Sequence, residues 1–253
     1  MAHPLNDPCN LIKRANRNLV EINDVLTEWR SQNPYTLVRE PDGDEPVYRF
    51  KLVVNDHPPD DLGTAIGEFA YNLRAGLNQL VWQLSLRFTP DLDPSALEGT
   101  TEFPIFHEFK SDDIRKRLRL IKDSDARAII RGLQPYHQGD SAKQDLLSVI
   151  YYLHNVSKYQ VLQALGLLIR YRVGFGSSGQ GIGLNLTIRH FDDETPILVP
   201  RLQVPGFDLQ VDFTFGVALA DVGPTGFVTT ETFRAMYDYV SGILLSFERF
   251  FSD

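Results

Sequence analysis

The feature that most constrains the fold is a run of apolar residues spaced three or four apart within residues 60–87. Steps of three and four return to the same face of an α-helix, so this spacing predicts a long amphipathic helix that buries one side. Asp60 or Asp61 is placed to cap its first turn. The apolar positions are Leu62, Ile66, Phe69, Leu73, Leu77, Leu80 and Leu84.

The rest of the chain predicts an α+β protein that forms one domain over residues 1–253. We expect a helical bundle within residues 8–170, interrupted by a small hairpin at 35–54, and a helix over 141–169 that begins in a capping box. Beyond residue 170 the apolar residues alternate with polar ones. This pattern predicts an antiparallel β-meander and a closing helix within 171–253.

Charge is unevenly distributed along the chain. The net charge is −8, yet residues 110–131 hold eight basic and four acidic residues, so that segment is +4 and the remainder is −12. An acidic chain is poorly suited to non-specific binding of nucleic acid over its whole surface. The segment is either a solvated helix face with local ion pairs or a patch for a protein, anionic or RNA partner. The basic patch proper comprises Arg115, Lys116, Arg117 and Arg119.

Several patterns point to a cytoplasmic protein that does not enter a membrane. A single cysteine, Cys9, excludes an internal disulfide framework. The N-terminus lacks the basic-then-apolar pattern of a secretory signal. The longest apolar run, 161–169, is too short to span a bilayer.

No motif for a cofactor or a metal emerges from the sequence. Gly174, Gly176 and Gly179 have the spacing of a dinucleotide-binding loop, but an alternating strand pattern follows where that loop needs a helix. The six histidines are scattered, and no pair has the spacing of a zinc-binding helix. We therefore expect neither a cofactor nor a metal.

Polar residues in two apolar helices form the candidate site. Arg74 and Asn78 share a face of the helix at 60–87, while His154 and Lys158 are four residues apart on the later helix, beside Asn155. Antiparallel packing of the two helices would bring these residues together. Such a cluster either satisfies backbone groups, which is a structural role, or binds an anion such as phosphate. His154 is the candidate acid or base near neutral pH.

The same helices carry a resemblance to a known family. The run from Ala65 to Leu80 resembles the Asn-Leu-Arg-Ser-Ala-Leu-Asp-His-Leu signature of a widespread bacterial family whose function is not established. A later helix of that family contains Asp-Lys-His-Arg, where this chain has Ser-Lys-Tyr-Gln at 157–160. The pieces 103–105 and 134–136 also fit, so the similarity spans roughly residues 8–170.

More distantly, the arginine-bearing helix is similar to the HEPN superfamily. That superfamily includes metal-independent ribonucleases, often homodimers, with an arginine followed by a histidine after four to six residues. The resemblance puts Arg74 in the arginine position, but Gln79 takes the place of the histidine, and Lys158-Tyr159 replaces the Lys-His of the later helix. We therefore predict a binding or assembly protein without catalysis. The alternative is a ribonuclease-like enzyme in which Arg74 stabilises phosphate and His154 transfers protons.

Overall fold

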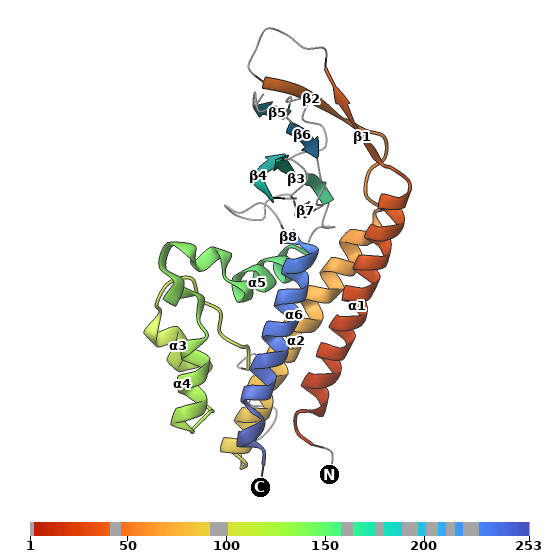
Figure 1. Cartoon of the computed structure of the whole chain (residues 1–253). Coiled ribbons are helices and arrows are strands. Elements are labelled where there is room, and N and C mark those ends of the chain that lie inside the picture. The colour runs from red at the N-terminus through yellow and green to blue at the C-terminus, as the bar shows by residue number, and fades with distance from the viewer. Residues whose placement is uncertain are drawn as a thin grey trace.

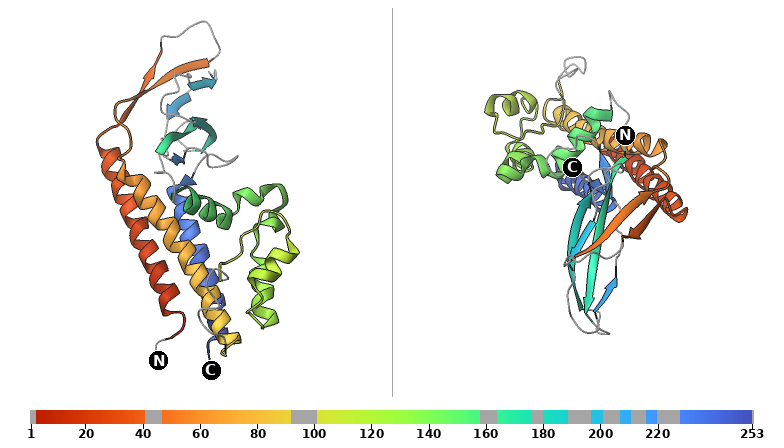
Figure 2. Two further views of the ribbon diagram at one scale, coloured as in Figure 1. Left: turned by 180° about the vertical axis from the view of Figure 1, so that it is seen from behind. Right: turned by 90° about the horizontal axis from the view of Figure 1, so that it is seen from above.

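Three long helices lie alongside one another and form the body of the protein (Figures 1 and 2). The structure is a computed structural model. Helix α2 packs against α1 and against the C-terminal helix α6, and α5 packs against α2 and α6 near one end of these helices. The helices are α1 (Asn6–Ser31), α2 (Asp61–Phe88), α5 (Leu146–Ser157) and α6 (Thr230–Ser246). The structure describes residues 3–40, 47–91, 101–157, 164–175, 180–188, 197–200, 207–210, 216–219 and 228–252.

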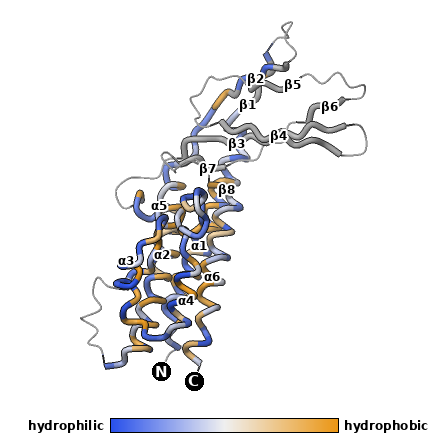
Figure 3. Tube along the Cα trace, turned by 90° about the vertical axis from the view of Figure 1, so that its left-hand side faces the viewer, coloured by the Kyte–Doolittle hydropathy of each residue, from blue (hydrophilic) through white to orange (hydrophobic). Residues whose placement is uncertain are grey.

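The core of the bundle is the apolar face of α2 predicted from the sequence. All seven apolar residues at the three- and four-residue steps are completely buried, which confirms the predicted helix face. Phe69 meets Phe233 of α6 edge to face, with ring centroids 5.6 Å apart. Hydrophobic and hydrophilic positions alternate along the helices in Figure 3, as expected where each helix buries one side.

Two glycines of α2 let the neighbouring helices come close. A Cβ atom at Gly76 would lie 2.7 Å from Cδ1 of Ile12 on α1, and one at Gly67 would lie 2.9 Å from Cβ of Ser157 on α5. Real Cβ atoms do not approach other atoms so closely. The absence of a side chain at these two positions therefore sets the spacing of α2 from both partners.

A second helical unit lies beside the bundle. It comprises α3 (Ser111–Arg117), α4 (Ser124–Gly132) and the 3-10 helix η2 (Pro135–Gln144). Asp123 caps α4 by accepting hydrogen bonds from the backbone N–H groups of Asp125 and Ala126. Another 3-10 turn, η4 (Glu248–Phe250), follows α6.

The single helix predicted over 141–169 is wrong. The carboxylate of Asp145 accepts a hydrogen bond from the backbone N–H of Leu147, and α5 begins there and not at the predicted capping box. Helix α5 ends at Ser157, and residues 164–169 belong to strand β3. A short apolar run such as 164–169 suits a buried strand as well as a helix, so the pattern alone does not separate the two.

The order of the strands in the sheets differs from their order along the chain. β1 pairs antiparallel with β2, and β5 joins the other edge of β2. β4 pairs with one edge of β3, while β6 and β7 also pair with β3 and β7 in turn pairs with β8. The strands are β1 (Tyr35–Arg39), β2 (Val47–Val54), β3 (Ala164–Phe175), β4 (Gln180–Ile188), β5 (Ile197–Pro200), β6 (Phe207–Gln210), β7 (Gly216–Leu219) and β8 (Val228–Thr229).

The predicted α+β class with a C-terminal antiparallel meander is therefore wrong. The residues that the structure describes are mainly helical. A meander would pair each strand with the next along the chain. Instead β5 pairs with the N-terminal strand β2, and the long β3 accommodates two short strands at different points along its length. Apolar alternation identifies a strand but does not identify its partner, and this is why the arrangement could not be predicted.

Among the helices that the structure describes, none is both long enough and apolar enough to cross a lipid bilayer.

Candidate anion-binding site

The centre of the candidate site is the side chain of Arg74, on the face of α2 toward α5. Only 4% of this residue is exposed. Burial lowers the pKa of its guanidinium to about 10, an effect that Glu102 and Tyr151 partly offset and Arg117 adds to. The side chain therefore keeps its positive charge at neutral pH.

Within the part of the chain that the structure describes, the buried Nη1 of this guanidinium has no hydrogen-bond partner. A buried charge is normally paired or fully hydrogen-bonded, because removing it from water costs several kcal/mol. The cation therefore has a donor available for a ligand.

Arg74 lines a pocket of about 220 Å³ between α2, α5 and the segment before α3. Two aromatic rings, three neutral polar side chains, one alanine, one arginine and one histidine form its lining. These residues are Tyr71, Arg74, Ala75, Asn78, Gln79, Trp82, Thr101 and His154.

His154 reaches the same pocket from α5. His154 is 8% exposed. The centroid of its ring lies 5.9 Å from that of Tyr71, a residue that is 56% exposed. Packing of α5 on α2 thus brings together Arg74, Asn78 and His154, three of the residues proposed for the site. Asn155 is half-buried on α5 and does not line the pocket, and Lys158 lies outside the described residues.

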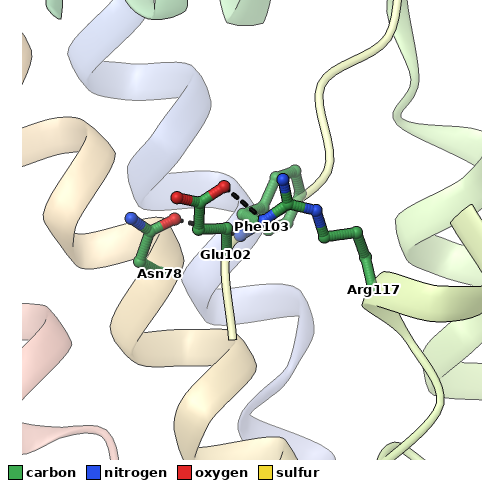
Figure 4. Close-up of polar contacts among 4 residues, drawn as sticks. All are labelled: Asn78, Glu102, Phe103 and Arg117. Atoms are coloured by element: carbon green, nitrogen blue, oxygen red, sulfur yellow. Dashed lines mark hydrogen bonds and ion pairs between the residues drawn. The ribbon is translucent and has the colours of Figure 1, made fainter. Parts of the chain in front are cut away.

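The orientation of the Asn78 amide is fixed by the backbone of the neighbouring segment. Its Oδ1 accepts a hydrogen bond of 2.9 Å from the backbone N–H of Phe103, as Figure 4 shows. Because this bond uses the oxygen, the group of Asn78 that is left to interact with a ligand is its amino group, a hydrogen-bond donor. A donor beside a cation suits an anionic ligand.

Another polar cluster of α2 has a structural role. Nδ2 of Asn72 donates to Oδ1 of Asn18 on α1 at 3.0 Å and to the carbonyl of Glu68 at 2.9 Å. Nδ2 of Asn18 in turn donates to the Glu68 carboxylate at 3.0 Å. These bonds satisfy the buried amides and connect α1 to α2, so Asn72 serves the packing and not the pocket.

The basic patch on and after α3 divides into solvated and paired residues. Lys116 and Arg119 are exposed, and Arg115 forms an ion pair with Asp112 in its own helix. Arg117, the last residue of α3, forms an ion pair with Glu102, next to the pocket residue Thr101. Local pairing thus accounts for two of the four patch residues.

The sequence analysis did not assign Tyr71, Trp82 or Thr101 to the site. Tyr71 and Trp82 lie on the same helix face as Arg74 and Asn78, because the four residues are spaced by three, four and four, and this spacing was available in the sequence. Thr101 comes from a segment far from α2 in the sequence, and no local pattern places it there. Among the described residues, no group of three or more histidine, cysteine or acidic side chains is placed to hold a metal ion.

Comparison of the chain with protein-family models, with curated proteins and with solved structures found no match.

Proposed function

We propose that this protein is a non-catalytic binding protein that takes a small phosphate-type oxyanion in the Arg74 pocket. The observation that carries the proposal is the buried guanidinium whose Nη1 has no partner among the described residues, in the lining of a pocket. A bound anion would supply a hydrogen-bond partner for this nitrogen and a negative charge next to the buried cation.

The remaining lining fits such a ligand. The planar guanidinium can donate two parallel hydrogen bonds to one oxyanion. The amino group of Asn78 and the hydroxyl of Thr101 are neutral donors in the same lining, and Trp82 and Tyr71 supply aromatic walls. Gln79, which stands where the HEPN histidine would be, cannot exchange a proton near neutral pH. Its presence favours binding over catalysis.

Titration with inorganic phosphate tests the proposal, with tryptophan fluorescence as the signal. The chain has two tryptophans, of which Trp82 lines the pocket and Trp29 is buried on α1. We expect a saturable change in the wild type that Trp82→Phe removes. Arg74→Gln should weaken binding about tenfold or more, since a hydrogen bond to a charged group contributes about 1.5–3 kcal/mol.

Arg14→Gln is the matched control. Arg14 is exposed on α1 and outside the pocket lining, and its replacement changes the net charge by the same amount. The control should bind phosphate as the wild type does. Equal affinity in Arg74→Gln and the wild type would contradict the proposed function.

One observation favours the ribonuclease-like alternative. His154 lines the same pocket as Arg74, and an enzyme of that kind would need both at one site. Our proposal predicts no cleavage of RNA in metal-free buffer. Cleavage by the wild type that is lost in both Arg74→Gln and His154→Gln would replace the binding function with the enzymatic one.

For localisation and assembly, we extend the proposal to a bacterial cytoplasmic protein that forms a homodimer. The resemblance of residues 8–170 to a bacterial family and the single cysteine support the compartment. The more distant likeness of the Arg74 helix to the often dimeric HEPN proteins supports the homodimer. Light scattering of the purified protein tests the dimer: a mass near 28.7 kDa would contradict it.

A further inference from the structure

One wall of the pocket is a short segment that is held from two sides. On the α2 side, the backbone N–H of Phe103 donates to Asn78, and the Phe103 ring is fully buried. On the α4 side, Nε2 of the buried Gln134 donates to the carbonyl of Pro104 at 2.9 Å. These contacts fix the backbone on the C-terminal side of Glu102, and Thr101 on its other side lines the pocket.

Glu102 therefore places a negative charge beside a pocket that is proposed to bind an anion. Its side chain is 53% exposed, and its Oε2 forms an ion pair with Nη1 of Arg117 from α3 (Figure 4). Both charges act on the buried cation, because Glu102 raises the pKa of Arg74 and Arg117 lowers it. The electrostatic potential in the pocket thus depends on three side chains and not on Arg74 alone.

We propose that Arg117 is a positioning residue for the anion: its ion pair holds and neutralises Glu102, so that Arg74 remains available to the ligand. This inference rests on the proposed function. Without Arg117, the Glu102 carboxylate would repel the incoming anion and compete with it for the Arg74 guanidinium.

The contrast with the other ion pair of α3 supports this role. Arg115 and Asp112 are three residues apart in one helix, and both are strongly exposed. Arg117 instead pairs across a separation of fifteen residues with the segment that forms the pocket wall. An exposed ion pair contributes little to stability, so the effect of Arg117 should be measured as ligand affinity.

Phosphate titrations of four variants test the inference. Arg117→Gln should weaken phosphate binding about three- to tenfold, as expected for an uncompensated charge near a partly exposed site. Arg117→Lys keeps the positive charge and should bind nearly as the wild type does. Glu102→Gln should bind at least as tightly as the wild type, and the double variant Glu102→Gln/Arg117→Gln should recover the affinity lost in Arg117→Gln.

Arg115→Gln serves as the matched control, because it removes the same charge from the same helix, and it should change affinity by less than about twofold. Wild-type affinity in Arg117→Gln would overturn the inference. A double variant as weak as Arg117→Gln would also overturn it, because the role would then be structural. If Arg74→Gln loses binding and Arg117→Gln does not, only this inference fails. If Arg74→Gln binds normally, the proposed function itself fails.

Discussion

The ring of Tyr151 on α5 covers the guanidinium of Arg74 on α2, with the guanidinium carbon 5.6 Å from the ring centroid. An aromatic face stabilises a cation without using its N–H donors, which lie in the plane of the guanidinium. This contact helps to explain how a buried arginine is held in place while one of its nitrogens has no hydrogen-bond partner among the described residues.

Replacing Tyr151 should therefore weaken phosphate binding without abolishing it. Tyr151→Leu removes the cation–π contact, which contributes about 0.5–2 kcal/mol, and should weaken affinity by about two- to thirtyfold. Tyr151→Phe keeps the aromatic face and should bind nearly as the wild type does. Calorimetric titration with phosphate measures both, and a similar loss in the two variants would show that the hydroxyl, and not the ring face, matters.

The close approach of α2 to α5 predicts that Gly67→Ala is destabilising. The new Cβ would lie 2.9 Å from Cβ of Ser157, which is not the flexible end of a side chain, so a helix must shift. We expect a loss of about 1–3 kcal/mol in the free energy of unfolding by urea. Gly242→Ala on α6 is the control: nothing lies within 4 Å of its Cβ position, so it should stabilise by about 0.5–1 kcal/mol.

The bonds between α1 and α2 predict a cost for Asn72→Ala. This change leaves Oδ1 of the buried Asn18 without its donor and should lower the free energy of unfolding by about 1–3 kcal/mol. Asn23→Ala is the matched control, because Asn23 is exposed and its amide donates within its own helix, to the carbonyl of Leu19. Its effect should stay within about 0.5 kcal/mol. Equal losses in the two variants would contradict the role given to Asn72.

The pKa of Asp145 predicts how stability depends on pH. Burial raises the pKa of this carboxyl, so the folded protein holds the proton to a higher pH than the unfolded chain does. The stability associated with this group is therefore fully present below the unfolded pKa, near 3.8, and is lost as the pH rises through the folded value.

Asp145→Asn should remove this dependence while keeping the oxygen that accepts from Leu147. We expect the variant to gain stability relative to the wild type as the pH rises from about 3.8 toward neutrality. Urea unfolding at a series of pH values measures the difference. A difference that does not vary with pH would show that Asp145 has no such shift.

Local patterns predicted the helices better than they predicted the strand partners. The apolar face of α2 follows from the spacing of Leu62 to Leu84, because the helix repeat alone determines which residues are buried. The pairing of β5 with β2 joins segments about 150 residues apart, and no local pattern encodes it. The end of α5 at Ser157 was missed for a related reason, because the apolar residues after it are compatible with a helix as well as with a strand.

The candidate site also combines residues that a local pattern predicts with residues that only long-range contacts bring together. Arg74 and Asn78 are one helical turn apart, so their shared face could be predicted from sequence. Thr101 lines the pocket and Glu102 lies next to it in the chain because Phe103 bonds to Asn78 and Gln134 bonds to Pro104, which are contacts between distant segments. The charge balance of the pocket could therefore be recognised only in the folded protein.

Thermal unfolding of the wild type and Arg74→Gln in phosphate, compared with chloride at equal ionic strength, tests directly whether Arg74 binds the anion. A ligand that binds only the folded state stabilises it by about 2.7 kcal/mol at a hundred times its Kd. We expect phosphate to raise the Tm of the wild type and of Arg14→Gln equally and to raise that of Arg74→Gln clearly less, because a tenfold loss of affinity removes about half of this stabilisation. An equal rise in Arg74→Gln, or no rise in the wild type, would contradict this role of Arg74.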